Sequence, residues 1–392
     1  MVKAAILGFG VVGSGVAEVL SMNEDKITRT TGGISLKYIV DIRDFPDSKF
    51  GNLVVKDFSV VENDPEVKIV IETIGGVGVA YEFTKRALKK GKSVVTSNKE
   101  LVATHGIELM DIAEENGASY FFEACVGGGV PIIRPIEQCL AANSITEIYG
   151  ILNGTTNYIL TQMIRNGLAF DVALKQAQEL GYAEANPAAD VEGHDVCRKI
   201  CILAAMCFGN HVYPDQVPTE GILDVTAADV AFAAGKNCKI KLLGRALEQD
   251  GKVYAYVAPH LVPEEDLVAG VEDVMNGIVV KGNAIGTAMF YGPGAGKMPT
   301  ASAVVADAMD AVKHLHDPKA PAWAEGIEGL VGNADDLQYT WYVRTKKDIG
   351  LGELLGSENG EYAWITAPMT KGEAVSAYKY AEIQSMFRVL HQ

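Results

Sequence analysis

The chain opens with the feature that most restricts its fold, a strand pattern followed directly by a glycine-rich turn and a helix pattern. Residues 2–7 (VKAAIL) are mostly apolar, and GFGVVGSGVAEVL follows at once. Further strand patterns at 34–41, 67–73, 93–98 and 118–124 alternate with helix patterns. This alternation predicts an α/β fold with a doubly wound parallel sheet that helices cover on both faces.

The pattern changes after about residue 130. A helix with proline in its first turn is predicted at 131–143, and strand pairs are predicted at 239–262 and 276–292. A long helix is predicted from 299. We therefore expect three parts, which are a dinucleotide-binding domain at 1–130 completed by a helix at 299–330, an α+β domain at 131–298, and a small unit at 337–392.

Composition narrows the possible partners. The 392 residues carry a formal net charge of −16, which argues against nucleic acid or an anionic membrane as a partner, because both require a basic face. No apolar run reaches the ~18 residues of a membrane span, and the N-terminus lacks the pattern of a signal peptide. The six cysteines show no paired spacing, so we expect reduced thiols and a cytoplasmic protein.

The glycine turn predicts a dinucleotide site. Gly8, Gly10 and Gly13 form GxGxxG between a strand and a helix, which is the context that gives this common pattern meaning. The glycines permit a tight turn, close approach of a pyrophosphate and close helix packing, while the helix N-terminus supplies N–H groups. The residues expected to contact the cofactor are Gly8, Phe9, Gly10, Val11, Val12 and Gly13.

The end of the second strand offers two different ribose ligands. Asp41 would accept hydrogen bonds from the ribose diol of NAD, whereas Arg43 would pair with the 2′-phosphate of NADP. The sequence does not decide between them, so the predicted cofactor is NAD(P).

Two later strand ends also carry candidate site residues, because ligands of such sheets bind beyond the carboxyl ends of the strands. Thr73 precedes a glycine pair in ETIGG (72–76), which allows close approach of a nicotinamide. Lys99 in TSNK (96–99) opens a predicted helix, where a cation opposes the helix dipole and is more easily explained by a function.

The segment FFEACVGGGVPII (121–133) supports two hypotheses. Carbonyl groups near Glu123 could hold a hard monovalent cation, which prefers oxygen ligands. Cys125 could instead be the nucleophile of an aldehyde dehydrogenase, although a small buried packing residue is the simpler interpretation.

The stretch GYAEANPAADVEGHDVCRK (181–199) collects acidic and basic residues where a loop becomes a helix. Asp195 and Lys199 are spaced i,i+4 and therefore share one helix face. This spacing is typical of an ordinary exposed ion pair, and it also suits an acid and a proton donor at a substrate.

Together these segments resemble the homoserine dehydrogenases. The similarity covers GFGVVGSGV, TSNKELVA, FFEACVGGGVPIIRPI, LNGTTNYIL, GYAEANPAADVEGHDVCRK and GPGAGKMPTASAVVAD, in the family's order over residues 1–316. The resemblance implies interconversion of L-aspartate 4-semialdehyde and L-homoserine with NAD(P), within threonine, methionine and isoleucine biosynthesis. It also implies a Rossmann domain, a substrate domain that makes a homodimer or higher homo-oligomer, and a small-molecule substrate.

The resemblance also assigns roles to residues. Lys199 would donate the proton to the carbonyl group, and Lys99 would assist in positioning the substrate or transferring the proton. The substrate would be held by Glu184, Asp190, Asp195, Thr155 and Gly181, a bound Na⁺ by Glu123, Val126, Gly128 and Val130, and the cofactor also by Gly294 and Gly296.

The C-terminal unit departs from the family pattern. Residues 337–392 resemble a shortened, degenerate ACT-type effector domain that lacks one strand of the βαββαβ unit. Two alternative functions stay open at this point, a semialdehyde dehydrogenase that uses Cys125 and a non-catalytic nicotinamide-binding regulator.

Overall fold

The computed structural model describes residues 1–319, 321 and 323–390, which divide into two compact units. The first unit comprises Met1–Ala142, Gly209–His211 and Pro293–Glu325, and the second comprises Asn143–Phe208, Val212–Gly292 and the residues from 326 onward. Among the described residues, no helix combines the length and the apolar character that a membrane-spanning segment requires.

The first unit is built on a parallel sheet, as predicted, with six strands in the order β3-β2-β1-β4-β5-β6, of which the short β3 was not predicted. Its strands are β1 (Val2–Leu7), β2 (Ile34–Val40), β3 (Val54–Val55), β4 (Val67–Glu72), β5 (Ser93–Thr96) and β6 (Tyr120–Phe121). β1 pairs in parallel with β2 on one side and with β4 on the other. The order in which successive strands are added to the sheet therefore reverses at β1. Ligands of doubly wound sheets bind beyond the carboxyl ends of the strands at such a switch point.

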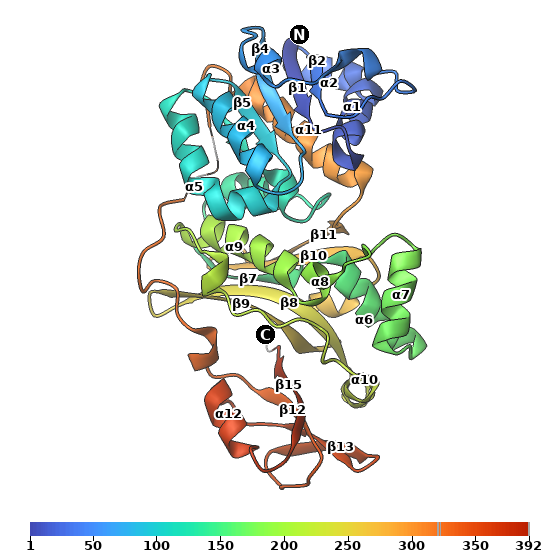
Figure 1. Cartoon of the computed structure of the whole chain (residues 1–392). Coiled ribbons are helices and arrows are strands. Elements are labelled where there is room, and N and C mark those ends of the chain that lie inside the picture. The colour runs from blue at the N-terminus through green and yellow to red at the C-terminus, as the bar shows by residue number, and fades with distance from the viewer. Residues whose placement is uncertain (320, 322, 391–392) are drawn as a thin grey trace. The chain divides into compact units, whose positions relative to one another are not determined.

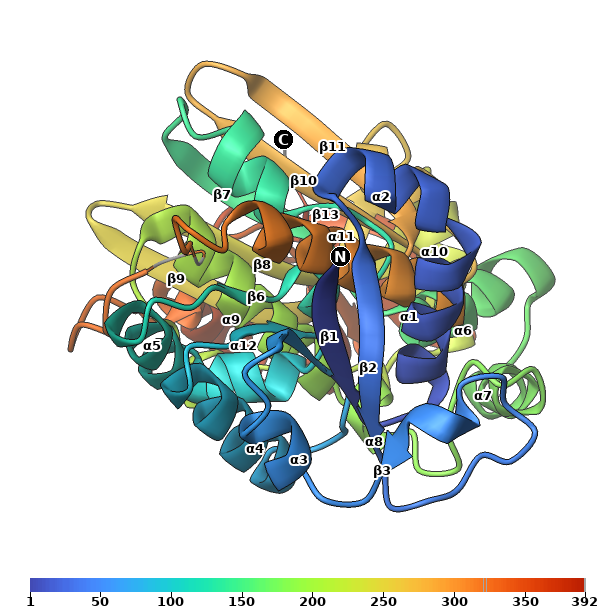
Figure 2. The same cartoon turned by 90° about the horizontal axis from the view of Figure 1, so that it is seen from above.

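Helices cover both faces of this sheet (Figures 1 and 2). One face packs against α1 (Val11–Met22), α2 (Glu24–Thr31) and α11 (Lys297–Lys313), and the other carries α3 (Ser59–Glu62), α4 (Gly78–Lys89) and α5 (Lys99–Glu115). The apolar core on the first side includes Val16, Leu20, Ile71 and Val304, none more than 6% exposed. Burial of these side chains supplies the main stabilisation and fixes the glycine turn at the start of α1.

The second unit contains a nine-stranded mixed sheet in the order β11-β10-β7-β8-β9-β15-β12-β14-β13. The predicted strand pairs appear as the hairpin β8 (Cys238–Gln249) and β9 (Lys252–Pro263) and the pair β10 (Met275–Gly282) and β11 (Gly286–Pro293), and β7 (Ile145–Ile151) lies between β10 and β8. Helix α9 (His194–Phe208) packs on β7, β8 and β9, and the unit's other helices are α6 (Gly154–Asn166), α7 (Phe170–Glu179), α8 (Ala188–Val191) and α10 (Ala227–Ala234).

The C-terminal segment continues this sheet. Its elements are β12 (Trp341–Thr345), β13 (Glu353–Glu358), β14 (Glu361–Ile365), α12 (Lys371–Ala377) and β15 (Ile383–Val389). β15 pairs in parallel with β9 through Arg388 opposite His260 and Val389 opposite Leu261. The segment therefore shares a sheet and a compact unit with the substrate-domain strands. The prediction that this segment lacks one strand of the βαββαβ unit is wrong, because all four strands are present. Among the described residues, the element that is absent is the helix between the first and second strands.

Two predicted helices are shorter than expected. The helix predicted at 131–143 is reduced to a π-helical segment at Pro135–Cys139, and the Glu123 carboxylate accepts the amide hydrogens of residues 132–134 just before it. The helix predicted at 299–330 ends at Lys313, shortly before Pro318 and Pro321, which cannot continue a helical hydrogen-bond ladder.

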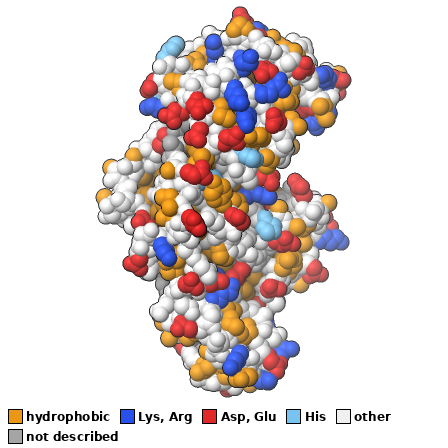
Figure 3. All heavy atoms as spheres, turned by 60° about the vertical axis from the view of Figure 1, so that its left-hand side comes forward, with side chains coloured by type: hydrophobic (Ala, Val, Ile, Leu, Met, Phe, Trp, Pro, Cys, Tyr) orange, Lys and Arg blue, Asp and Glu red, His pale blue; other side chains and the backbone are white. Residues whose placement is uncertain are grey.

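Acidic and basic side chains are interspersed on the molecular face in Figure 3.

Candidate active site

The turn between β1 and α1 has a backbone that only glycine accommodates. Gly8 has φ of +84°, and a Cβ atom at Gly13 would lie 2.0 Å from the Gly8 carbonyl oxygen and 2.8 Å from Thr73 Oγ1. At Gly10, the N-cap of α1, a Cβ would meet nothing within 4 Å. The turn therefore leaves open space at a helix N-terminus, which fits the pyrophosphate of a dinucleotide.

The remaining residues of the turn are placed differently. Phe9 is buried and packs edge-on against the rings of Phe45 and Phe50. Val11 is 67% exposed at the first turn of α1, and Val12 packs partly against the core. The structure thus brings Phe9 and Val11, but not the Val12 side chain, to the pocket described next.

A pocket of about 730 Å³ adjoins the glycine turn. Three cations line it, Arg43, Lys49 and Lys297, together with one acid, Glu18, which is paired with Lys297 Nζ at 2.5 Å. The other lining residues are Phe9, Gly10, Val11, Ser14, Phe45, Ser48 and Phe50. Sequence reasoning found Arg43 but missed Lys49, which no motif marks, and Lys297, which is distant in sequence from the strand-end acid.

Asp41 lies beside this pocket but is engaged by protein groups. Its Oδ2 accepts the Phe9 N–H at 2.7 Å, and Arg43 Nε and Nη2 donate to its two oxygens at 3.1 and 3.0 Å. Burial acts to raise the pKa of Asp41, but the hydrogen bonds from Arg43 and Phe9 outweigh it and lower the pKa to about 2. Asp41 is therefore an anion held between the glycine turn and Arg43.

Thr73 and Lys99 follow neighbouring strands of the sheet. Thr73 Oγ1 donates to the carbonyl oxygens of Leu7 and Gly8, at 3.0 and 2.8 Å, which ties the end of β4 to the glycine turn. Asn98 caps α5 by accepting the Leu101 N–H, so Lys99 is the first residue of this helix, as predicted. Both residues thus belong to the carboxyl edge of the first unit's sheet.

Cys125 does not have the environment of a nucleophile. The side chain is 2% exposed, and its Sγ donates weakly to the Thr96 carbonyl oxygen at 3.6 Å. Burial raises the pKa of the Cys125 thiol well above its usual value, so the thiol stays protonated. A packing role for Cys125 fits this geometry better than the role of a nucleophile in an aldehyde dehydrogenase.

The segment around Glu123 is held together by the Glu123 carboxylate. Oε1 accepts the N–H groups of Ile132 and Ile133 at 2.6 and 3.0 Å, and Oε2 accepts the Arg134 N–H at 2.8 Å. Within the described part of the chain, no hydrogen bond is accepted by the carbonyl groups of the other expected cation ligands, which are Val126, Gly128 and Val130.

The glycines of GPGAG (292–296) meet this segment. A Cβ at Gly128 would lie 2.4 Å from the Gly294 carbonyl oxygen, and Gly129 N–H donates to the Pro293 carbonyl oxygen at 3.0 Å. Gly296 has φ of +119° and is the N-cap of α11. The two glycine stretches therefore pack backbone against backbone within the first unit.

In the second unit, α9 brings Asp195 and Lys199 together in a buried ion pair. Lys199 Nζ donates to Asp195 Oδ2 at 2.7 Å and to the Leu152 carbonyl oxygen at 2.6 Å. The two residues are only 6% and 8% exposed. The i,i+4 spacing is thus confirmed, but the pair is not an ordinary exposed one.

Asn153 connects this pair to a second acid. As the N-cap of α6, its Oδ1 accepts the Thr156 N–H, while its Nδ2 donates to Asp195 Oδ2 at 2.8 Å and to Asp190 Oδ1 at 2.7 Å. Sequence reasoning treated LNGTTNYIL as a cap and a substrate contact without selecting Asn153. An asparagine before a glycine at a helix start is the signal that marks such a cap.

The remaining substrate candidates are Thr155 in α6 and two residues of the loop between α7 and α8, Gly181 and Glu184. Thr155 Oγ1 donates to the Tyr182 carbonyl oxygen at 2.6 Å, which anchors this loop to α6. Gly181 has φ of +75°, and Glu184 has an exposed side chain while its carbonyl oxygen accepts from Gln178 Nε2. The structure joins Thr155 and the loop, and it places the Glu184 carboxylate at the surface of this unit.

Comparison with known proteins identifies the family. Residues 8–123 match the family model "Homoserine dehydrogenase, NAD binding domain", and residues 131–309 match the model "Homoserine dehydrogenase". A homoserine dehydrogenase of Bacillus subtilis is 40% identical over 376 residues, which is 93% of this chain and 84% of the relative. One of Pseudomonas aeruginosa is 43% identical over 321 residues, which is 81% of this chain and 74% of the relative.

Solved structures agree with the sequence relatives. A homoserine dehydrogenase from Thiobacillus denitrificans superimposes with a TM-score of 0.92 at 34% identity, covering 99% of this chain and 98% of that one. A hyperthermophilic archaeal homoserine dehydrogenase in complex with NADPH gives a TM-score of 0.68 at 29% identity, covering 80% of this chain and 98% of that one. The glycine turn, the buried Asp195–Lys199 pair and these relatives together show that the chain belongs to the homoserine dehydrogenases, oxidoreductases with an NAD(P)-binding domain.

Proposed function

We propose that Lys199 is the proton donor when this chain interconverts L-aspartate 4-semialdehyde and L-homoserine. The observation that carries the proposal is the buried pairing of Lys199 with Asp195 and the Leu152 carbonyl oxygen. An ammonium group has three N–H donors, and directing two of them to fixed acceptors orients the group. Asp195 and the Leu152 carbonyl oxygen thereby set the direction from which the proton is delivered.

The chemistry of the reduction requires such a group. The bound nicotinamide supplies the hydride, for which the glycine turn and the open space at Gly10 provide a fitting cradle. Negative charge then develops on the substrate oxygen, and a nearby ammonium group both stabilises this charge and releases a proton to it. Asp195 accepts a hydrogen bond from the Lys199 ammonium group and holds it in place before the transfer.

The acids beside this pair suit the amino group of an amino-acid substrate. We propose that Asp190, Asp195 and Glu184 hold the substrate, with Thr155 and Gly181 shaping the loop around it, and that Lys99 assists in positioning the substrate or transferring the proton. Asn153 supports this proposal because it holds Asp190 and Asp195 through one amide nitrogen. The acids are thus fixed before any substrate arrives.

The decisive assay is formation of reduced cofactor from L-homoserine, measured separately with NAD⁺ and NADP⁺. We expect turnover in the wild type, a large loss in Lys199→Ala, and wild-type rates in Lys175→Ala, which removes an exposed lysine from α7. Absence of turnover with both cofactors in folded protein would contradict the proposal.

A preference for NADP is the finer proposal for the cofactor. Asp41, the acid that would accept from a ribose diol, already accepts from Arg43 and Phe9. The adjoining pocket carries Arg43, Lys49 and Lys297 against the single acid Glu18. This excess of positive charge suits a 2′-phosphate.

A monovalent cation is proposed for the segment after Glu123. The carbonyl oxygens of Val126, Gly128 and Val130 would supply its ligands, because hard cations prefer oxygen. The Glu123 carboxylate holds the shape of the segment through its three amide donors. Activity that falls when Na⁺ is replaced by tetramethylammonium at constant ionic strength would support this site, and unchanged activity would contradict it.

We also propose that the chain forms a homodimer in the cytoplasm. The edge strand β11 presents unpaired backbone and an exposed Tyr291, and such an edge is commonly covered by another chain. All six cysteines are free thiols, which suits a reducing compartment. Light scattering after size exclusion tests the dimer, and a monomeric mass at micromolar concentration would contradict it.

A further inference from the structure

Glu72, the last residue of β4, is an acid buried at the carboxyl edge of the first unit's sheet. Its side chain is inaccessible to solvent. Oε1 accepts the Ile74 N–H at 2.6 Å, and Oε2 accepts the Thr96 hydroxyl at 2.5 Å. One carboxylate therefore links the segment after β4 to the end of the neighbouring strand β5.

The link continues from Thr96 to the start of α5. Thr96 Oγ1 accepts the Asn98 N–H at 2.9 Å, so its hydroxyl hydrogen is left to donate to Glu72. Asn98 Nδ2 donates to the carbonyl oxygens of Ile74 and Gly76, at 3.2 and 2.6 Å. Glu72, Thr96 and Asn98 thus close a ring of hydrogen bonds that holds residues 74–76 against the helix start occupied by Lys99.

The same segment also packs on the glycine turn. Thr73 donates to the Gly8 carbonyl oxygen at 2.8 Å, and a Cβ at Gly8 would lie 3.1 Å from both the Thr73 carbonyl oxygen and Ile74 Cγ1. The carboxyl ends of β1, β4 and β5 are therefore connected through residues 73–76. Cofactors of such sheets bind at this edge.

Keeping a carboxylate here is costly for the fold. Burial raises the pKa of Glu72 to about 7, although the hydrogen bonds from Thr96 and Ile74 act in the opposite direction. The titratable groups that face it are the Cys125 thiol and the Tyr120 phenol, and burial raises the pKa of both, so both are neutral near pH 7. These neighbours carry no positive charge that would stabilise a Glu72 carboxylate, and burying such a charge costs stability. A function of Glu72 would explain why an acid lies here.

We propose that Glu72 is a positioning residue of the dehydrogenase, which acts through Ile74 and Thr96 to hold residues 73–76 and the Lys99 helix start in the geometry that binds the cofactor. The proposal rests on the proposed roles of Thr73 and Lys99 at the cofactor. The deprotonated carboxylate can accept hydrogen bonds from both the Ile74 N–H and the Thr96 hydroxyl. A protonated carboxyl group carries a hydrogen on one oxygen, and that hydrogen competes with one of these donors. Protonation removes one acceptor and loosens the ring.

The test compares Glu72→Gln with wild type and with Glu82→Gln, which changes an exposed acid on α4 of the same unit. NADPH affinity is measured by fluorescence titration without substrate from pH 5.5 to 8.5, together with kcat and KM. We expect Glu72→Gln to weaken NADPH binding about 10-fold at pH 8. The NH₂ group of the new amide is a donor and would face either the Ile74 N–H or the Thr96 hydroxyl, so one of these two hydrogen bonds would be lost. Wild-type affinity should fall as the pH drops through about 7, and the variant should lack this transition.

Thr96→Val provides a second, independent variant, because it keeps the side-chain shape and the Glu72 acid while removing the hydroxyl. It should weaken NADPH binding in the same direction. Wild-type affinity and an unchanged pH profile in folded Glu72→Gln or Thr96→Val would overturn the proposal. NADPH binding is read without turnover, so a wild-type enzyme that fails to oxidise homoserine would disprove the roles of Lys199 and its neighbours and leave this test intact.

Discussion

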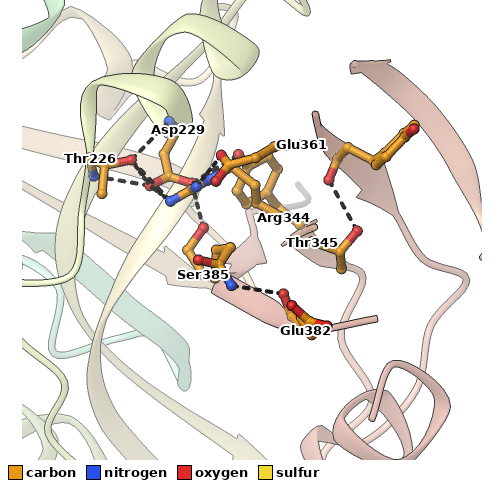
Figure 4. A network of polar contacts seen from close by, with 10 residues as sticks. Thr226, Asp229, Arg344, Thr345, Glu361, Glu382 and Ser385 are labelled. Atoms are coloured by element: carbon orange, nitrogen blue, oxygen red, sulfur yellow. Dashed lines mark hydrogen bonds and ion pairs between the residues drawn. The ribbon is translucent and has the colours of Figure 1, made fainter. Parts of the chain in front are cut away.

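Arg344 of β12 and Asp229 of α10 form a buried ion pair that ties the C-terminal strands to the substrate-domain part of the second unit. Arg344 Nε donates to Asp229 Oδ1 at 2.7 Å, and the two side chains are 5% and 0% exposed. Arg344 also contacts Thr226 and Glu361, while Ser385 of β15 donates to the same Asp229 oxygen (Figure 4). The C-terminal segment is therefore joined to the rest of the second unit by side chains as well as by the continuous sheet.

Breaking this pair should destabilise the second unit. Arg344→Met removes the cation and leaves the Asp229 carboxylate buried with only neutral donors, so we expect a loss of about 3–5 kcal/mol in the free energy of unfolding. The control is Lys347→Met, which breaks the exposed pair with Glu382 and should cost less than about 1 kcal/mol. Urea unfolding followed by circular dichroism measures both, and equal effects of the two variants would contradict the expectation.

The same pair predicts an acid transition in stability. Burial acts to raise the pKa of Asp229, but the hydrogen bonds from Arg344 and Ser385 outweigh it and lower the pKa below 3.8. The stability that this ionised group contributes is therefore present above the unfolded value of about 3.8 and is lost as the pH falls through the folded pKa. Arg344→Met should move the loss to higher pH, which thermal midpoints recorded between pH 3 and 7 would show.

Lys199 should be needed for the chemical step more than for cofactor binding. Lys199→Ala is expected to reduce kcat by roughly 10²-fold or more with nearly unchanged cofactor affinity. Lys199→Arg keeps the charge beside Asp195 but does not release its proton near neutral pH, so we expect it to be equally impaired. Steady-state kinetics and NADPH titration distinguish the two effects. Loss of cofactor binding in either variant would show that the assigned role is wrong.

Arg43 should decide the cofactor preference. Arg43→Ala removes a cation from the pocket beside the glycine turn and releases Asp41 to accept from a ribose hydroxyl. We expect the KM for NADP⁺ to rise about 10-fold or more while the KM for NAD⁺ stays near its wild-type value or falls. Arg29→Ala, at an exposed position of α2, is the control. A parallel change in both KM values would contradict this role.

The first unit was predictable because its signals are local. The glycine turn and the apolar strand patterns fix the order of the elements, and the Asp195–Lys199 spacing already indicates a shared helix face. The burial of that pair depends on Leu152 and Asn153, which come from a different element and carry no periodic signal. The continuation of the sheet through β15 was likewise missed, because strand pairing between β9 and β15 is a long-range contact that propensity does not reveal.

The glycines of the turn should fail in two different ways when alanine replaces them. At Gly13 the new Cβ would lie 2.0 Å from the Gly8 carbonyl oxygen, so the backbone must shift, and we expect a loss of about 1–3 kcal/mol in stability together with weaker NADPH binding. At Gly10 a new Cβ would meet no atom within 4 Å apart from its own chain neighbours, so Gly10→Ala should keep wild-type stability and weaken NADPH binding alone. Gly78→Ala, in open space at the start of α4, should alter neither property. Thermal unfolding and NADPH titration of the three variants test the pattern, and normal NADPH binding in Gly10→Ala would contradict a cofactor seated against this turn.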